Sequence, residues 1–490
     1  MNSIIWVIIY PLLTAFSLLV IDHFFKRLYQ GVVIISGIIL FLLGGNLLLE
    51  SFAQARAYSL GSWAVTKGIN LVLDPLAGIL VFLTTGLALL IIIYSLKYIK
   101  ANKIKYYTLF FILIAALNGL FLTGDLFNMF VCLEIVSIAS YALVAFKQNN
   151  KAYEASFKYI IIGSLGGFFI LLAIILIYQQ TGTLNLAQLV KHAQTMPEII
   201  DKAIIMLLLV GFGSKFALFP LHTWLPDAHP AAPASISALL SGIVIKGYLY
   251  AWLRTLLVLD GPGQIISSNF NLIILYSGVA TLIVGHLLAY QQKSLKRLLA
   301  YSSISQIGYI MIGLGTFKEQ GFNGAFLHII NHAVVKSALF LCAGIFSQKL
   351  KAKKIAELQG VGYKKPYLGL FFTLGAVTII GLPPFNIFIS KWLIASAALK
   401  AKFVIPGATI LLGSILALSY YLKVIKTLYS KDNIKVQSLK GNWQFQVPIA
   451  LLTVSCLIIG LQPNFILVKL QEAVTYLLQT DKYYQILFTG

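Results

Sequence analysis

Long apolar segments dominate this 490-residue chain and restrict its fold more than any other feature. A helix needs about 20 consecutive apolar residues to cross a hydrocarbon core about 30 Å thick, and about fourteen segments meet this requirement. Because only 11% of the residues are charged, too few for a soluble domain, we predict an all-α integral membrane protein. The predicted spanning helices lie near residues 3–21, 31–49, 71–96, 106–123, 126–146, 157–179, 203–225, 232–257, 270–290, 297–316, 324–347, 368–398, 403–428 and 445–468.

The basic residues are distributed unevenly among the connecting loops. Of the 37 Lys and Arg residues, 23 lie in loops after odd-numbered helices, 10 lie in even loops and the tail, and 4 lie inside helices. Because cytoplasmic loops carry the excess of Lys and Arg, we predict that the odd loops are cytoplasmic. Both termini are then outside a multi-pass protein of the cell membrane. The net charge of +22 follows from this topology, so we predict no nucleic-acid partner.

Two of the predicted helices contain a break. The seventh is interrupted at Phe219-Pro220 and the twelfth at Leu382-Pro383-Pro384-Phe385. Proline frees a backbone carbonyl, which protein or water must satisfy within a membrane. A broken helix in each half of a chain is typical of an inverted-repeat transporter whose ion path lies beside the breaks. No linker or soluble segment divides the chain, so residues 1–490 are predicted to form a single membrane domain.

Several ionisable side chains lie well inside the apolar segments. Each costs about 2.5 to 3.5 kcal/mol at a helix centre, or roughly 12 to 17 kcal/mol for five of them before pairing and hydration. One alternative is that each charge is paired or extends to a membrane interface. We favour a role in ion movement because the total cost is large. The five residues are Glu134, Lys215, Lys246, Lys336 and Lys391.

Lysine is the informative residue type among these five. A desolvated ammonium group can lose its proton, whereas arginine stays charged. A row of buried lysines can therefore pass protons along, and a nearby carboxylate can change the proton affinity of one of them. A fixed anion site would favour arginine, so this set predicts a proton relay.

The predicted eleventh helix adds two histidines to the relay. His328, His332 and Lys336 are spaced four residues apart and therefore share one helical face. Histidine titrates near neutral pH and can shuttle protons. A zinc site is an alternative, but the pattern lacks the glutamate of H-E-x-x-H and a third ligand. A polar packing face without an ion role is a second alternative, and we predict neither a metal nor a cofactor.

The segment SKFALFPLHTWLPDAHPAAPAS at residues 214–235 combines four prolines with charged and histidine residues. Three of its polar side chains, His222, Asp227 and His229, are expected at or just beyond the cytoplasmic surface. A rigid loop explains them as well as a proton entrance or a coupling surface does. We therefore retain them as possible entrance or coupling residues.

At these residues the sequence resembles the antiporter-like proton-conducting membrane subunits of respiratory complex I, membrane-bound hydrogenases and Mrp multisubunit cation/proton antiporters. The similarity extends over nearly the whole chain, and the proline-rich motif is highly specific. The matching segments are PLHTWLPDAHPAAPASISALLSGIVIKGYLY (220–250), TGDLFNMFVCLEIVSIASYAL (123–143), LKRLLAYSSISQIGYIMIGLG (295–315) and FLHIINHAVVKSALFLCAG (326–344).

The resemblance implies fourteen helices with two inverted five-helix repeats around an axis of buried charges. Residues 1–105 would hold helices 1–3, residues 106–257 the first repeat, residues 270–428 the second, and residues 445–490 helix 14 and the tail. It also implies functional residues at matching positions. These are Glu134 in the fifth helix, Lys215 in the seventh, Lys246 in the eighth, His328, His332 and Lys336 in the eleventh, and Lys391 in the twelfth.

The resemblance leaves two kinds of host complex open. The lysine at position 391 is a feature in which the chain resembles the D-type Mrp subunit and the N-type complex I subunit. The segment GTLNLAQL at 182–189 resembles the D-type Mrp subunit. We therefore expect a proton-translocating subunit of a Na⁺/H⁺ antiporter that works with other membrane subunits in the lipid bilayer. The alternative is a proton-pumping subunit of NADH:quinone oxidoreductase or a membrane-bound hydrogenase. In either case no catalytic chemistry of its own is expected.

Overall fold

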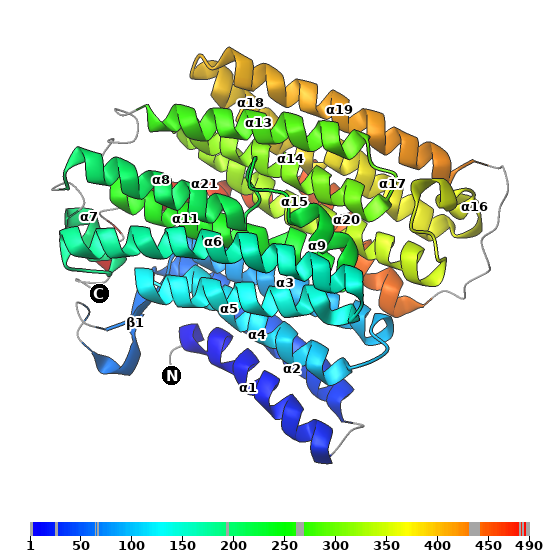
Figure 1. Cartoon of the computed structure of the whole chain (residues 1–490), viewed down its shortest axis with the longest axis horizontal. Helices are drawn as coiled ribbons and strands as arrows, with labels where there is room; N and C mark the ends of the chain where they lie inside the picture. The colour runs from blue at the N-terminus through cyan, green and yellow to red at the C-terminus, as the bar shows by residue number, and fades with distance from the viewer. Residues whose placement is uncertain are drawn as a thin grey trace.

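A computed structural model shows an almost entirely helical protein. It describes residues 3–24, 28–63, 65, 68–192, 196–260, 269–430, 442–479, 482 and 485–486. All statements below concern these residues. Figure 1 shows the long helices lying side by side, with α1 (Ser3–Phe24) at one edge and α19 (Val404–Leu428) at the opposite edge.

Twelve of the predicted segments correspond to continuous helices that are long and apolar enough to span a membrane. Besides α1 and α19, they are α2 (Tyr29–Ala53), α3 (Pro75–Tyr98), α4 (Lys103–Leu122), α5 (Leu126–Val144), α6 (Asn150–Thr181), α13 (Phe270–Tyr290), α14 (Leu295–Gly315), α15 (Glu319–Lys349) and α20 (Trp443–Leu461), together with a run made of α10 (Ala234–Leu239), the π-helical turn η4 (Leu240–Val244) and α11 (Ile245–Asp260).

The two predicted segments that contain prolines are interrupted. The first consists of α8 (Glu198–Lys215) and α9 (Leu225–Ala231), and the second of α17 (Pro366–Ile380) and α18 (Asn386–Lys400). The breaks predicted at Phe219-Pro220 and Leu382–Phe385 therefore lie where the helices stop. This is why the described residues hold twelve continuous spanning helices and not the fourteen expected.

Short elements connect or follow the long helices. The hairpin of β1 (Arg56–Ser59) and β2 (Asn70–Leu73) is antiparallel, with Arg56 opposite Leu73, and it lies at the same end of the bundle as α7 (Leu186–His192) in Figure 1. The hairpin was not predicted from the sequence. The other short elements are η1 (Leu60–Ser62), η2 (Ala145–Lys147), η5 (Ile355–Leu358), α16 (Val361–Lys364) and α21 (Asn464–Leu478).

The least hydrophobic spanning helices occupy the centre. The most apolar stretches of α15 and of the α10–η4–α11 run are completely buried, and that of α14 is 94% buried, whereas that of α1 is 33% buried. The mean hydropathy is 1.3 in α14 but 2.5 in α1. Helices that face lipid must be apolar around most of their surface, while central helices can direct polar side chains at one another. The buried polar groups are therefore gathered in the middle of the bundle.

Helices α6 and α8 touch backbone to backbone. A Cβ atom at Gly166 of α6 would lie 1.8 Å from Ser214 Oγ and 2.7 Å from the Gly211 carbonyl oxygen of α8. A Cβ at Gly211 would lie 2.8 Å from the Gly166 carbonyl oxygen. Small residues allow such close approach between membrane helices. The contact fixes the last turn of α8, where Lys215 lies, against α6.

Helix α20 closes over the break between α17 and α18. A Cβ atom at Gly460 of α20 would lie 2.1 Å from the Pro384 carbonyl oxygen and 2.7 Å from the Asn386 nitrogen. Both of these atoms belong to the backbone, which cannot move aside as a side chain can. No residue larger than glycine fits at this position without separating the helices.

We expect Gly460→Val to lower the stability of the subunit by about 1–3 kcal/mol or more, because overpacking against backbone forces helices apart. Thermal unfolding of the detergent-solubilised protein measures this loss. Gly45→Val in α2 is the matched control, since its Cβ would only touch Phe82 at 3.8 Å. Equal stability of the two variants would show that α20 does not rest on the break.

Candidate functional site

Lys215 and Glu134 form an ion pair across α8 and α5. Lys215 Nζ lies 2.8 Å from Glu134 Oε1 and 2.9 Å from Ser137 Oγ. The Lys215 side chain is completely buried, whereas the Glu134 side chain is 27% exposed. Lys215 is the last residue of α8, where the helix dipole favours a positive charge. The pair therefore joins a buried cation to a partly exposed carboxylate.

The break after Lys215 is supported by protein groups. Trp224 Nε1 donates to the Ser214 carbonyl oxygen at 2.8 Å, and the Phe219 N–H donates to Thr281 Oγ1 at 3.1 Å. The Trp224 ring stacks on Tyr159 of α6 with ring centroids 3.8 Å apart. Irregular backbone at membrane depth is tolerated where protein satisfies its polar groups. The break is consequently an ordered feature beside the ion pair.

Lys246 is completely buried in the first turn of α11. Its Nζ donates to the Ser241 carbonyl oxygen within the π-helical turn η4. Such turns are rare and often occur at functional sites. Ser241 Oγ is also 2.8 Å from Ser303 Oγ of α14. Lys246 therefore lies where the first half of the chain contacts the second.

The three residues predicted to share a face of α15 are all completely buried. His328 Nε2 lies 3.0 Å from Gln306 Oε1 and its Nδ1 lies 2.9 Å from Ser390 Oγ. The ring of His332 is parallel to that of His328 at 6.3 Å, and its nitrogens have no hydrogen-bond partner among the described residues.

Lys336 continues this face toward α14 and α19. Its Nζ donates to the Leu299 carbonyl oxygen and to Ser302 Oγ, both at 2.9 Å, and to the Tyr421 hydroxyl at 3.3 Å. These partners are neutral oxygen atoms. Along the α15 face, His328 is hydrogen-bonded and His332 is not, and Lys336 has no carboxylate partner in the described structure.

Lys391 of α18 faces the end of the other half of its broken helix. Its Nζ donates to the Ile380 carbonyl oxygen of α17 at 2.9 Å and to Ser414 Oγ at 3.0 Å. It also lies 4.4 Å from the centre of the Tyr309 ring. Carbonyl groups at a helix C-terminus and an aromatic face both attract a cation. Lys391 thus resembles Lys215 in lying beside a helix end at a break.

The three residues expected at the cytoplasmic surface differ in exposure. Asp227 is partly exposed and pairs with Arg297 at 2.8 Å and with Lys158 at 3.0 Å. The rings of His222 and His229, by contrast, are buried, and His229 stacks on Phe340 of α15 at 4.7 Å. Helix α9, which holds His229, packs between α6 and α14, and His222 lies beside Phe219 and Tyr301. The expected surface position fits Asp227 but not the two rings.

Comparison with known proteins identifies the protein family. The family model described as NADH:quinone oxidoreductase/Mrp antiporter, TM matches residues 123–418, which include the five buried charges and the histidine face. The chain belongs to this family. The resemblance inferred from the sequence motifs is therefore confirmed.

Relatives of both expected kinds are similar to the chain. The N-type subunit of the NADH-quinone oxidoreductase of Desulforudis audaxviator is 34% identical over 87% of this chain and 86% of the relative. The D-type subunit of the Na(+)/H(+) antiporter of Alkalihalophilus pseudofirmus is 32% identical over 84% of each chain. A chain of the membrane-bound sulfane sulfur reductase, an archaeal respiratory membrane complex, is 30% identical with a TM-score of 0.94 over 99% of this chain and all of that one. The sequence identities to the first two relatives, 34% and 32%, are too similar to decide which kind of complex contains this chain.

This family member also contains buried polar residues that the sequence analysis missed. His286 of α13 is completely buried, with Nδ1 3.0 Å from the Tyr420 hydroxyl and Nε2 3.2 Å from the Tyr309 hydroxyl. Tyr420 neighbours Tyr421, which contacts Lys336, and the Tyr309 ring contacts Lys391. His286 therefore bridges the last two lysines. Its signal in the sequence is a histidine well inside an apolar segment, equivalent to the buried charges.

The described residues bring no group of three His, Cys, Asp or Glu side chains together as metal ligands. The histidines contact serine, glutamine, tyrosine and aromatic rings instead. The arrangement is suited to proton transfer between lysine, histidine and hydroxyl groups.

Proposed function

We propose that this chain is the proton-translocating subunit of a multisubunit Na⁺/H⁺ antiporter of the Mrp type. The observation that carries the proposal is the ion pair between buried Lys215 and Glu134, followed across the bundle centre by buried lysines and histidines. Buried ionisable residues in membrane helices mark ion and proton pathways. The names of the relatives, as subunits of an antiporter and of a quinone oxidoreductase, support membrane partners.

In the proposed mechanism a proton enters from the cytoplasm near Lys246 and is held at Lys215. The Glu134 carboxylate stabilises the ammonium form at a contact of 2.8 Å. When a cation or a neighbouring charge offsets Glu134, Lys215 releases its proton toward the α15 histidines. The proton then reaches Lys391 and leaves to the outside. Because each charge changes the proton affinity of its neighbours, the lysines titrate as a coupled set.

A Lys246→Met variant tests this path. We expect Na⁺-driven proton flux in proteoliposomes holding the intact complex to fall by about 100-fold, since an essential proton carrier contributes about 10² or more to a transfer rate. Lys202→Met is the matched control, because Lys202 forms an exposed ion pair with Glu198 at the start of α8. Normal flux in an assembled Lys246→Met complex would exclude this residue from the path.

The proposal includes the membrane topology and the internal repeats. We propose cytoplasmic odd loops, both termini outside and two inverted repeats at residues 106–257 and 270–428. The repeats are supported by one interrupted helix in each half, with a lysine beside each break. In intact cells, a Ser3→Cys variant should react with a membrane-impermeant maleimide. If this cysteine reacts with the maleimide only after the cells are lysed, the N-terminus lies inside and the proposed topology is wrong.

The second candidate is a proton-pumping subunit of a redox complex. It is favoured by the 34% identity to an N-type subunit of NADH-quinone oxidoreductase and by the similarity to a chain of a respiratory complex. Mass spectrometry of the proteins that copurify with the tagged chain in mild detergent distinguishes the hosts. Small membrane partners alone would support the antiporter. Iron-sulfur or hydrogenase-like partners would support the redox-driven pump.

A further inference from the structure

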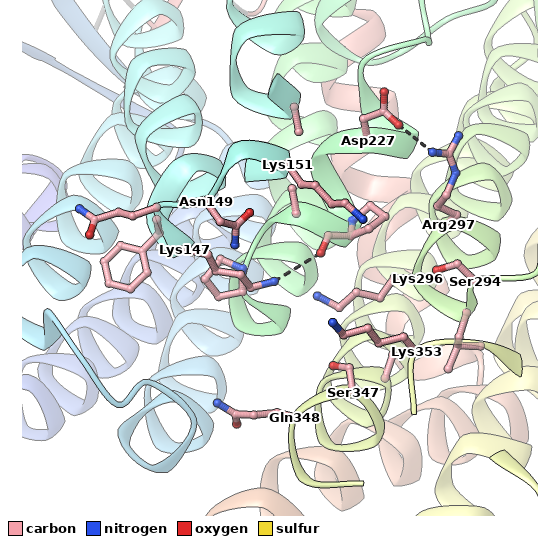
Figure 2. A pocket seen from close by; sticks show the side chains of 18 of the residues that line it. Lys147, Asn149, Lys151, Asp227, Ser294, Lys296, Arg297, Ser347, Gln348 and Lys353 are labelled. Atoms are coloured by element: carbon pink, nitrogen blue, oxygen red, sulfur yellow. Dashed lines mark hydrogen bonds and ion pairs between the residues drawn. The ribbon is translucent and has the colours of Figure 1, made fainter. Parts of the chain in front are cut away.

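A large cavity opens at one end of the bundle. Its volume is about 1120 Å³. The turn between α3 and α4, the start of α6, helix α9, the start of α14 and the end of α15 all contribute to its lining. Segments from both halves of the chain therefore meet around one space (Figure 2).

The cavity lining is strongly basic. Seven Lys and Arg side chains face two carboxylates, Glu154 and Asp227. Both carboxylates are already occupied, because Asp227 pairs with Arg297 and Lys158, and Glu154 also pairs with Lys158. Within the described structure, the remaining lysines of the lining have no carboxylate in ion-pair contact.

Two of these lysines share one backbone acceptor. Lys147 Nζ and Lys296 Nζ donate to the Ala232 carbonyl oxygen at 2.9 and 3.0 Å. Lys296 is only 7% exposed, and its other contacts are to the His229 carbonyl oxygen and Ser237 Oγ. A buried cation normally has a charged partner. Neutral oxygen atoms orient these ammonium groups but do not balance their charge.

The amino groups of several lysines point to the same space. Figure 2 shows Lys147, Lys151, Lys296 and Lys353, from different segments, directed toward one another. Like charges held together repel one another, so the arrangement is stabilised by an anion placed between them.

A topology signal alone does not explain this cluster. The positive-inside bias requires basic residues in loops, where they can extend to solvent and lipid headgroups. Lys423 and Lys426 of α19 are exposed in this way. Lys296 is buried and is directed into a cavity, so it is removed from the surface on which that bias acts.

We propose that the cavity binds a phosphate-bearing anion, in which phosphate oxygens accept hydrogen bonds from the ammonium groups of Lys147, Lys296 and Lys353. A phosphate monoester carries about −1.5 to −2 charge at pH 7, which matches several lysines better than a single carboxylate does. Lysine binds phosphate as a mobile point charge. A soluble phosphate compound and the headgroup of an anionic phospholipid share this chemistry. The cavity lining includes Asp227 but none of the lysines of the proposed relay.

Two measurements on the intact complex test the site. Pyrophosphate is titrated into the complex in detergent and followed by calorimetry, and native mass spectrometry records phospholipids retained from the membrane. We expect one saturable site in the first or one retained anionic phospholipid in the second. Binding of pyrophosphate indicates a soluble ligand, and a retained phospholipid indicates a headgroup.

Charge-removing variants provide the decisive comparison. The pair Lys147→Gln and Lys296→Gln is expected to weaken binding at least about 10-fold, since charge-assisted hydrogen bonds are about twice as strong as neutral ones. If the double variant at Lys147 and Lys296 fails to fold, the double variant Lys151→Gln, Lys353→Gln tests the site instead. It removes two exposed lysines at the rim of the cavity. The double variant Lys423→Gln, Lys426→Gln is the control, because it loses the same charge. Its binding affinity is expected to stay within about 2-fold of wild type, a smaller change than the loss of one ion contact would cause.

Three outcomes would overturn the proposal. The first is that neither pyrophosphate nor an anionic phospholipid binds. The second is that the α19 control loses binding as much as the cavity variants. The third is that carboxyl-to-amine crosslinking joins Lys353 to an acidic residue of a partner subunit, because the missing charge would then come from protein. Each readout is independent of proton transport, so failure of the proposed function would leave this test intact.

Discussion

Replacing Lys215 with alanine is expected to abolish coupled ion transport while the subunit still assembles. The substitution removes the ammonium group that lies 2.8 Å from Glu134 and 2.9 Å from Ser137. We expect proton flux in proteoliposomes to fall by at least about 100-fold, because the loss of a general acid–base group costs about 10² to 10⁴. Native gel electrophoresis of the complex measures assembly in the same preparation.

A Lys215→Arg variant distinguishes a role of Lys215 as proton carrier from a role as fixed positive charge. Arginine keeps the positive charge next to Glu134 but does not release a proton in proteins. If Lys215 is a carrier, the arginine variant should assemble normally and remain as inactive as the alanine variant. Full transport in Lys215→Arg would show that the position needs only a fixed charge, and normal transport in Lys215→Ala would remove it from the relay.

Replacing Asp74 with alanine is expected to produce the largest loss of stability. Asp74 begins α3, accepts from the Ala77 N–H at 2.8 Å, and pairs with Arg254 of α11. Both side chains are at most 5% exposed. Removal of one partner of a buried ion pair costs about 3–5 kcal/mol. Thermal unfolding of the purified complex should show this loss, although Asp74 lies outside the proposed relay.

The comparison with an exposed ion pair makes this prediction specific. Glu154→Ala breaks the contact with Lys158, and the Glu154 side chain is 65% exposed. Exposed pairs contribute about 0–1 kcal/mol, so this variant should unfold close to wild type. A double variant, Asp74→Leu with Arg254→Met, removes both charges and should recover part of the stability. If Asp74→Ala is as stable as Glu154→Ala, the pair does not join α3 to α11.

The long apolar helices and their breaks were predictable from sequence because both depend on local patterns. A run of about 20 apolar residues has few other uses, and the prolines after Phe219 and Leu382 end helices by removing backbone donors. The buried charges were also visible, since a lysine such as Lys215 within such a run is costly wherever its partner lies. Whether they carry protons stays a prediction.

Partners from distant parts of the chain were not predictable from one sequence. His286 contacts Tyr420, which is 134 residues away, and no local pattern signals that contact. The burial of Lys296 was unpredictable for a different reason. Its place in the sequence indicates a loop lysine, and only the folding of α9 over the start of α14 buries it. The hairpin of β1 and β2 is too short to be recognised beside so many apolar segments.

The glycine contact between α6 and α8 limits how this protein can move. With Gly166 and Gly211 in close contact, α6 and α8 leave no space for a larger side chain, and the end of α8 is held against α6. We therefore expect a change of state at Lys215 to involve its flexible side chain more than a displacement of the end of α8 against α6.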